Sequence, residues 1–496
     1  MISNNSITKT LPQGWKKCKF SDIATIRNGY AFSKNDFSRE QNHDNGIPLI
    51  KQTQLDGNKV DLSKACYLPT NYLKEYSDFL IQKNDVLIGM SGSIGKLCIY
   101  QHDFPALQNQ RTGLIKTYNN EIDNKFFWLF LQTIETKLMS GSKGVGVQNI
   151  SSNDIEDIEF SLPPLSEQQR IVAKIDSLFS ELENGVTMLK TIKAQLAIYR
   201  QAVFKWAFEG KLTEEWRHIN TNENQENTIR DMTIARDMEV GKEKYKNIDQ
   251  EFPIYELPKE WKWVSIGYIS KGVSYGTSSK SSKKGKVVVL RMGNIQNGTF
   301  VYDDLAYTSN KKEIEKYQLH EGDVLFNRTN SPELVGKTAL YNGSIPSIFA
   351  GYLIRLNQIS YINASYLTYY LNSPHARECG NIAKTDGVNQ SNINGTKLST
   401  YPFPLCSKSE QQAIVSAIES RLSVCDKLEQ TIDQTLALSA SLRQSILKKA
   451  FEGRLVPQDP NDEPAEKLLE RIKAEKAAVL EKQKKTRKRG KIWSIN

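Results

Sequence analysis

The fold of this chain is decided by two matching stretches, LPPLSEQQRIVAKIDSLFSELE (162–183) and KSEQQAIVSAIESRLSVCDKLE (408–429). Each ends in a similar way, with QAVFKWAFEGKL (201–212) and QSILKKAFEGRL (444–455). The two copies keep a constant offset of 243 residues, without a gap, from Gly144/Gly387 to Leu212/Leu455. A repeat of such long period predicts a duplicated structural unit.

Each copy predicts one long helix. Ser166 and Ser409 are the expected N-caps, because a glutamine follows each of them three residues later, as in a capping box. Apolar residues then recur every three or four positions, and Gly210 and Gly453 suit the left-handed conformation that ends a helix. About 42 residues at about 1.5 Å each give a rod of roughly 60 Å. The apolar series includes Ile192, Leu428 and Leu442.

The matching caps, ends and spacing predict that the two helices pack on each other. Two equal units in one chain pack most simply about a pseudo-twofold axis. An antiparallel pair brings the end of the first helix beside the start of the second, which gives the polar linker at 213–256 a short path. The sequence therefore predicts an antiparallel coiled coil.

A mixed α/β domain precedes each helix. LPQGW (11–15) and LPKEW (257–261) open the two copies, short strand-like runs follow, and aromatic helical runs come next at 125–133 and 365–373. Glycine-rich loops at 140–151 and 384–394 close them. The predicted fold class is α+β, with two mixed α/β domains separated by two long helices and related by an internal pseudo-twofold repeat. The expected boundaries are 1–160 for the first domain, 161–212 for its helix, 213–256 for the linker, 257–405 for the second domain, 406–456 for its helix, and 457–496 for a C-terminal helix and basic tail.

Composition limits the class of protein. A chain of 496 residues with 39% hydrophobic and 25% charged residues is typical of globular proteins. No stretch approaches 18 consecutive apolar residues, and the N-terminus has no apolar core of a signal peptide. The six scattered cysteines form no CxxC pair, so neither disulfides nor a zinc site is predicted. We expect a cytoplasmic protein without a membrane segment. Its net charge of +10 permits a polyanionic partner.

No catalytic constellation is found in the sequence. SPELVGKT (331–338) resembles a phosphate-binding loop, but Ser331 stands where that loop begins with glycine, and a turn before a strand is the better interpretation. The five histidines are far apart and unpaired. The pattern favours a recognition or scaffold protein over an enzyme.

The repeated LPPLSEQQRIVAKI and AFEG motifs, the openings LPQGW and LPKEW, and the GVNQSNIN loop (387–394) together resemble the specificity subunit of a type I restriction–modification system. The resemblance covers about residues 11–480. It implies that the α/β units are target recognition domains, each reading one half of a bipartite double-stranded DNA target. It also implies that the helices space these domains and dock two methyltransferase subunits, and that motor–nuclease restriction subunits join the complex. The chain itself would have no enzymatic activity, no metal and no cofactor, because S-adenosylmethionine, ATP and magnesium would belong to the partner subunits.

The candidate contacts are residue types suited to each partner. Base edges are read by Arg, Lys, Asn and Gln, whereas phosphates require only positive charge. The DNA-binding candidates are Arg27, Lys34, Lys51, Gln52, Gln54, Arg111, Lys280, Lys283, Lys284, Arg291, Asn294, Arg328 and Arg355. The candidates for docking partner subunits are Gln168, Gln169, Gln411, Gln412, Phe208 and Phe451.

Three alternatives stay open. The chain could be a coiled-coil scaffold whose α/β domains bind proteins, or an enzyme with an unrecognised centre. It could also serve a related methylation-based defence system with a different nuclease. The DNA target sequence does not follow from the sequence of the chain.

Overall fold

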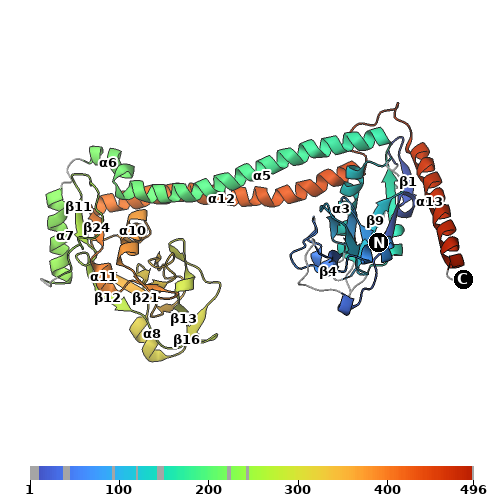
Figure 1. The fold of residues 1–496 in the computed structure, drawn as a ribbon. Helices are drawn as coiled ribbons and strands as arrows, with labels where there is room; N and C mark the ends of the chain where they lie inside the picture. The colour runs from blue at the N-terminus through green and yellow to red at the C-terminus, as the bar shows by residue number, and fades with distance from the viewer. Residues whose placement is uncertain are drawn as a thin grey trace, which may run out of the picture. The chain divides into compact units, whose positions relative to one another are not determined.

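The computed structural model describes residues 11–36, 45–57, 59–91, 95–118, 121–141, 150–220, 225–241 and 245–493. Most of the predicted glycine-rich loop at 140–151 therefore lies outside the described residues. Two compact units are formed, one from Met1–Met188 with Thr435–Asn496 and the other from Leu189–Gln434. Each unit contains one α/β domain, the beginning of one long helix and the end of the other (Figure 1).

Both long helices form as the repeat predicts. Helix α5 spans Leu165–Phe208 and helix α12 spans Lys408–Phe451. They start one residue before the predicted caps, so Ser166 and Ser409 lie in the first turn, which corrects that prediction. In α12 the cap is Ser407, whose hydroxyl accepts the Glu410 amide at 3.2 Å.

The predicted glycine ends of the helices are confirmed. Gly210 and Gly453 have φ of 74° and 67°. The Arg454 amide also donates to the Lys449 carbonyl, which is the bond that closes a helix ending at a left-handed glycine.

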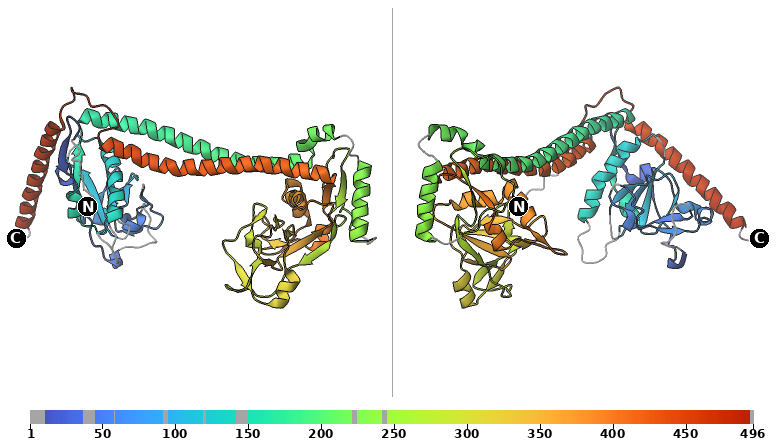
Figure 2. Two further views of the ribbon diagram at one scale, coloured as in Figure 1. Left: turned by 180° about the vertical axis from the view of Figure 1, so that it is seen from behind. Right: turned by 60° about the vertical axis from the view of Figure 1, so that its left-hand side comes forward.

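In each unit one half of α5 lies beside one half of α12 (Figures 1 and 2), and their ion pairs run in opposite directions along the two helices. In the second unit Lys193 pairs with Asp433 at 2.6 Å, whereas Arg200, further along α5, pairs with the earlier Asp426 at 2.6 Å. In the second unit the two helix halves are therefore antiparallel. In the first unit Arg443 and Glu183 form the equivalent of the Arg200–Asp426 pair, and Figures 1 and 2 show the same antiparallel arrangement.

The contact seam of α5 follows alternating steps of four and three residues, as in a coiled coil. It consists of the partly buried Leu182, Val186, Leu189, Lys193, Leu196 and Arg200. Three apolar residues predicted for the seams, Ile192, Leu428 and Leu442, are instead 38%, 47% and 51% exposed. Charged seam residues with matched partners specify the register of the pair, at some cost in stability.

Gly185 lies on the exposed side of α5, and a Cβ there would meet nothing within 4 Å. Gly185→Ala is expected to raise the free energy of unfolding by about 0.5–1 kcal/mol, because glycine loses more backbone freedom on helix formation than alanine does. Gly453→Ala is the matched control and should destabilise, since its φ is positive and Pro12 packs against it. Urea denaturation of both variants measures the effect, and a destabilised Gly185→Ala protein would contradict it.

The first unit carries two four-stranded sheets, ordered β2-β9-β6-β7 and β4-β3-β8-β5, and a separate β1-β10 pair. The C-terminal helix α13 packs on α1 and β1 through the buried Leu468 and Ile472. The elements are β1 Lys16–Lys19, α1 Phe20–Ile23, β2 Ala24–Asn28, β3 Ile47–Ile50, β4 Cys66–Leu68, α2 Tyr72–Glu75, β5 Leu80–Ile81, β6 Val86–Gly89, β7 Leu97–Ile99, β8 Ala106–Gln108, β9 Thr112–Thr117, α3 Asn124–Gly141, α4 Ser152–Glu156, β10 Glu159–Leu162 and α13 Ala465–Trp493.

The second unit repeats this topology. Its sheets β12-β21-β17-β19 and β16-β13-β20 correspond to those of the first unit, including one parallel pair in each (β3 with β8, β13 with β20). The turn at 331–337 precedes strand β19, as predicted. The elements are α6 Glu214–Ile219, α7 Gln225–Glu239, β11 Lys262–Ser265, β12 Ser270–Tyr275, β13 Val287–Leu290, β14 Ile295–Gln296, β15 Thr299–Phe300, β16 Ala306–Thr308, α8 Lys311–Tyr317, β17 Val324–Asn327, β18 Thr329–Asn330, β19 Thr338–Leu340, β20 Ser347–Phe349, β21 Leu353–Gln358, α9 Ala364–Leu371, α10 Pro374–Ala383, β22 Thr385–Asp386, β23 Ser391–Asn392, α11 Gly395–Ser399 and β24 Pro402–Leu405.

Candidate functional site

Each long helix begins with a buried glutamate that binds the tryptophan opening its own domain. Trp15 donates its indole N–H to Glu167 at 2.9 Å, and Trp261 donates to Glu410 at 2.8 Å. Both carboxylates are buried. The tryptophans of LPQGW and LPKEW therefore fix each domain to the helix that follows it in the chain.

A third segment, from just beyond the end of the other long helix, completes each junction. In the second unit Arg217 donates to Glu410 Oε1 at 2.6 Å and to the carbonyl of Gly210 at 2.5 Å. In the first unit the neutral Gln458 donates to Glu167 at 3.1 Å and to the carbonyl of Gly453 at 2.8 Å. The two junctions thus have the same plan.

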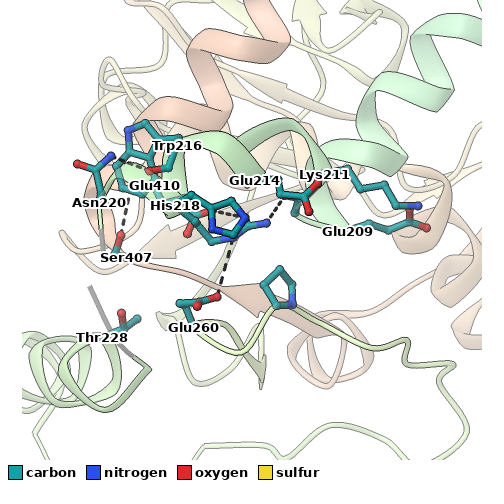
Figure 3. A pocket seen from close by; sticks show the side chains of 13 residues that line it. Glu209, Lys211, Glu214, Trp216, His218, Asn220, Thr228, Glu260, Ser407 and Glu410 are labelled. Carbon is teal, nitrogen blue, oxygen red and sulfur yellow. Dashed lines mark hydrogen bonds and ion pairs between the residues drawn. The ribbon is translucent and has the colours of Figure 1, made fainter. Parts of the chain in front are cut away.

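The junction of the second unit borders a cavity of about 510 Å³ (Figure 3). Glu410, Glu260 and Trp216 are among its lining side chains. Burial raises the pKa of Glu410, and hydrogen bonds from Thr213, Arg217 and Trp261 act against that rise. Burial likewise raises the pKa of Glu167.

Two of the docking candidates, Gln168 and Gln411, are fully buried. Gln168 accepts the Asp123 amide at 3.0 Å and donates to the Pro163 carbonyl, and Gln411 makes the equivalent bonds to Asn363 and Cys406. These glutamines hold the helix starts to their domains. Their neighbours Gln169 and Gln412 are exposed, and Gln412 accepts from Asn363 at 3.0 Å.

The aromatic docking candidates also lie inside the units. Phe208 is 1% exposed, and its ring lies 5.3 Å from that of Tyr366 and 5.2 Å from that of Tyr370. The partly buried Phe451 lies 5.1 Å from Phe126. Both rings pack the ends of the long helices against a domain.

The DNA candidates of the first domain divide into exposed and structural residues. Arg27, Lys34 and Arg111 are exposed. Gln54 is 3% exposed, and it accepts the Lys51 amide and donates to Lys64, so it caps a short 3₁₀ turn. The partly buried Lys51 and Gln52 belong to the same turn, and Lys51 Nζ contacts Cys66 Sγ at 3.5 Å.

The second domain shows the same division. Lys280, Lys283 and Lys284 are exposed on one loop. Asn294, 3% exposed, repeats the capping role of Gln54, and Arg291 pairs with Asp304 at 2.9 Å. Arg355 donates to the Gln318 carbonyl and to Asp323. Arg328 is partly buried beside β12.

In each domain one end of the sheet β2-β9-β6-β7 or β12-β21-β17-β19 carries a DNA candidate. We call this end the sheet-end surface, and its residues are Tyr30, Met90 and Arg111 in the first domain and Tyr275, Arg328 and Tyr352 in the second. In the first domain the Met90 amide donates to the Arg111 carbonyl at 3.0 Å. In the second domain the Arg328 amide donates to the Tyr352 carbonyl at 3.0 Å. The same backbone hydrogen bond therefore occurs in both domains. The arginine is the acceptor residue of this bond in the first domain and the donor residue in the second.

Sequence reasoning missed the tyrosines of the sheet-end surface. Tyr30, Tyr275 and Tyr352 are 40%, 44% and 50% exposed. The Arg328 guanidinium carbon lies 5.0 Å from the centre of the Tyr275 ring. The signal in the sequence is a glycine beside each tyrosine; two of these, Gly29 and Gly276, lie so close to neighbouring backbone carbonyls that no side chain fits.

Among the described residues, no group of three or more His, Cys, Asp or Glu side chains is placed to hold a metal ion. None of the helices among these residues has the length and hydropathy needed to cross a membrane.

The family profile described as "Type I restriction modification DNA specificity domain" matches residues 12–193 and 258–438, one match for each domain and its following helix. The chain belongs to this family. The resemblance seen in the repeated helix motifs is thereby confirmed. The chain is 27% identical to the type I restriction enzyme EcoKI specificity subunit of Escherichia coli K12, over 94% of this chain and 97% of that protein. It is 26% identical to the StySPI specificity subunit of Salmonella potsdam, over 94% and 96%.

Solved structures in this specificity family share the fold. The HsdS subunit from Thermoanaerobacter tengcongensis is similar with a TM-score of 0.52 and 18% identity, over 90% of this chain and 98% of that chain. A chain from a study of assembly and conformational transition of the type I R-M system has a TM-score of 0.58 and 18% identity, over 90% and 99%. The predicted fold class, with two repeated domains and two long helices, is confirmed.

Proposed function

We propose that this chain is the DNA sequence-recognition subunit of a type I restriction–modification complex in the cytoplasm. Each domain reads one half of a bipartite double-stranded DNA target. Helices α5 and α12 space the two halves and dock two methyltransferase subunits, and motor–nuclease subunits complete the assembly. The methyltransferase subunits bind S-adenosylmethionine, and the motor–nuclease subunits use ATP and magnesium.

One contrast within the chain carries this proposal. The junctions of the two units share the same tryptophan–glutamate plan, whereas the sheet-end surfaces differ, with Arg111 beside Met90 in one domain and Arg328 beside Tyr352 in the other. Different side chains on one scaffold are what two different half-sites require. Equivalent junctions are what two identical partners require.

Exposed residues repeated in both helices support two docking faces. Gln169 and Lys448 are exposed in the first unit, and their counterparts Gln412 and Lys205 are exposed in the second. Identical side chains at equivalent surface positions present the same chemistry twice. We therefore keep Gln169 and Gln412 as docking residues and add Lys205 and Lys448.

A methylation map tests the proposed function. The chain is expressed with its cognate methyltransferase subunit in a host without adenine methylation, and the DNA is read by modification-sensitive sequencing. Two short half-sites around a fixed gap are expected. A stable complex without any methylated motif would instead favour domains that bind proteins. Methylation by the isolated chain would point to an enzyme.

Arg328 and the lysines of the 280–286 loop are expected to contribute differently to DNA binding. Arg328→Ala should weaken binding to the cognate site by about 1–3 kcal/mol and relax one position of a single half-site. Lys283→Ala/Lys284→Ala should weaken binding to all sequences alike and reduce the salt dependence by about two phosphate contacts. Fluorescence titration of the assembled complex at several salt concentrations measures both. Unchanged affinity of the Arg328→Ala complex would remove this residue from the interface.

A further inference from the structure

The second unit contains a groove of about 810 Å³ between its helix pair and its α/β domain. Lys193, Arg200 and Phe204 of α5 and Leu422 of α12 line one side. The other side comes from α9, α10 and the turn that precedes β19, and Figure 1 shows α10 between the helix pair and the sheets. The sequence motifs and the junctions leave this groove without an assigned role.

Both cations on the helix side of the groove are already paired with acids of α12. Arg200 lies 2.6 Å from Asp426 and 3.2 Å from Glu429, and Lys193 lies 3.7 Å from Glu429 and 2.6 Å from Asp433. The remaining acid there, Glu419, accepts the Tyr369 hydroxyl at 3.5 Å. Among the described residues, the helix side therefore has no unpaired cation to offer an incoming anion.

The charges on the domain side have no such partners. Lys337, from the turn that resembles a phosphate loop, and Arg377 of α10 both line the groove. Neither makes an ion pair with any carboxylate among the described residues of the chain. Burial, and to a smaller extent the positive charge of Arg377, lowers the pKa of Lys337. Two neighbouring cations that face a cavity form a site for a carboxylate or a phosphate.

The rest of the lining selects between these two anions. Phe204 and Tyr369 stack with ring centres 5.8 Å apart, and Leu422 lies beside them in the groove. An apolar floor suits a protein segment with apolar side chains, whose one carboxylate can pair with Lys337 and Arg377. A DNA backbone carries a run of phosphates, and the phosphates beyond these two cations would meet the acids of α12.

We propose that this groove receives a carboxylate-bearing segment of the methyltransferase subunit, with the carboxylate held between Lys337 and Arg377. This inference rests on the proposed function and deepens it, because it names the chemistry of the partner at one of the two docking faces. The apolar side chains of the same segment cover Phe204 and Leu422. The groove then forms part of the interface between this chain and the methyltransferase subunit.

The test is the stoichiometry of the complex without DNA. The wild-type chain, mixed with its cognate methyltransferase subunit, is expected to hold two copies by native mass spectrometry. Lys337→Glu/Arg377→Glu should weaken the binding of one copy at least about 100-fold, since reversed charges leave the incoming carboxylate unpaired and repelled. The complex should then hold one copy, and unchanged hydrogen exchange in α9 and α10 shows that the second unit of the variant is folded.

Two matched variants and three outcomes decide the matter. Lys312→Glu, an exposed charge reversal on α8 outside the groove, should retain both copies, as should the charge-conserving Lys337→Arg/Arg377→Lys. If Lys337→Glu/Arg377→Glu binds two methyltransferase copies with unchanged affinity, the inference is wrong. The proposed function, which the methylation map tests, is then unaffected. Two copies with weaker DNA binding and a smaller salt dependence would mean that the groove holds a phosphate, which also overturns it. A wild-type chain that binds no methyltransferase overturns the inference and the proposed function together.

Discussion

Replacing Arg217 with methionine is expected to destabilise the second unit by about 3–5 kcal/mol at pH 8, because it leaves Glu410 charged, buried and without its ion-pair partner. The two side chains are 14% and 3% exposed, so the Glu410 carboxylate is largely shielded from bulk water. Urea denaturation, combined with hydrogen exchange at the amides of β11 and β24, measures the loss in this unit.

The loss should depend on pH in a defined direction. Arg217 lowers the pKa of Glu410, so its removal raises that pKa further. A carboxyl group with a raised pKa in the folded state contributes stability that is fully present below its unfolded pKa of about 4.3 and is lost as pH rises through the folded value. Arg217→Met should therefore destabilise less at pH 5 than at pH 8. Arg217→Met/Glu410→Gln should recover part of the stability and lose this pH dependence; a deficit that stays constant with pH in the single variant would contradict the explanation.

Phe208→Ala should cost about 3–5 kcal/mol, since it removes a buried ring between Tyr366 and Tyr370 and leaves a cavity. The end of α5 should then detach from the domain, with faster hydrogen exchange in α9. If Phe208 were a docking residue instead, the variant would keep its stability and lose only its partner. Hydrogen exchange and native mass spectrometry on the same sample separate these results.

Two controls calibrate that measurement. Phe208→Leu keeps most of the buried volume and should cost less than about 1.5 kcal/mol. Trp206→Ala changes a ring on the same helix that is 38% exposed, and its effect on stability should stay within about 0.5 kcal/mol. A loss of partner binding in Trp206→Ala without a loss of stability would add this residue to the docking face.

The long helices were predictable because their signals are local. Gly210 and Gly453 end the helices as expected, since only a residue free to adopt positive φ can close a helix in this way. The positions of the N-caps and of the coiled-coil seam were harder to predict from the sequence. Lys193 and Arg200 occupy seam positions because acids on α12 pair with them, and no pattern within α5 reveals what its partner helix supplies.

For the DNA-binding and docking candidates, the sequence predicted only suitable residue types and not their positions in the folded domains. Arg355 and Asn294 looked like base readers, yet their hydrogen bonds close on their own domain. Gln168 and Gln411 stand out in the repeat because they tie each helix start to a domain, which is a structural reason for the same residue to occur twice. Tyr275 and Tyr352 flank Arg328, but their aromatic side chains are neither cationic nor amide groups and so were not predicted.

Because the first unit is built from both ends of the chain and the second from its middle, the two units are completed in a fixed order during synthesis. The second unit is one continuous segment, Leu189–Gln434, and all of it is translated before the end of α12. The first unit needs Leu447 and Ala450 from the end of α12, and then Leu468 of α13, to cover a core that already contains Phe126 from early in the chain. A growing chain therefore completes its second domain first and carries an open first domain until α13 has been made. Helix α13 thus closes, late in synthesis, the domain that was translated first.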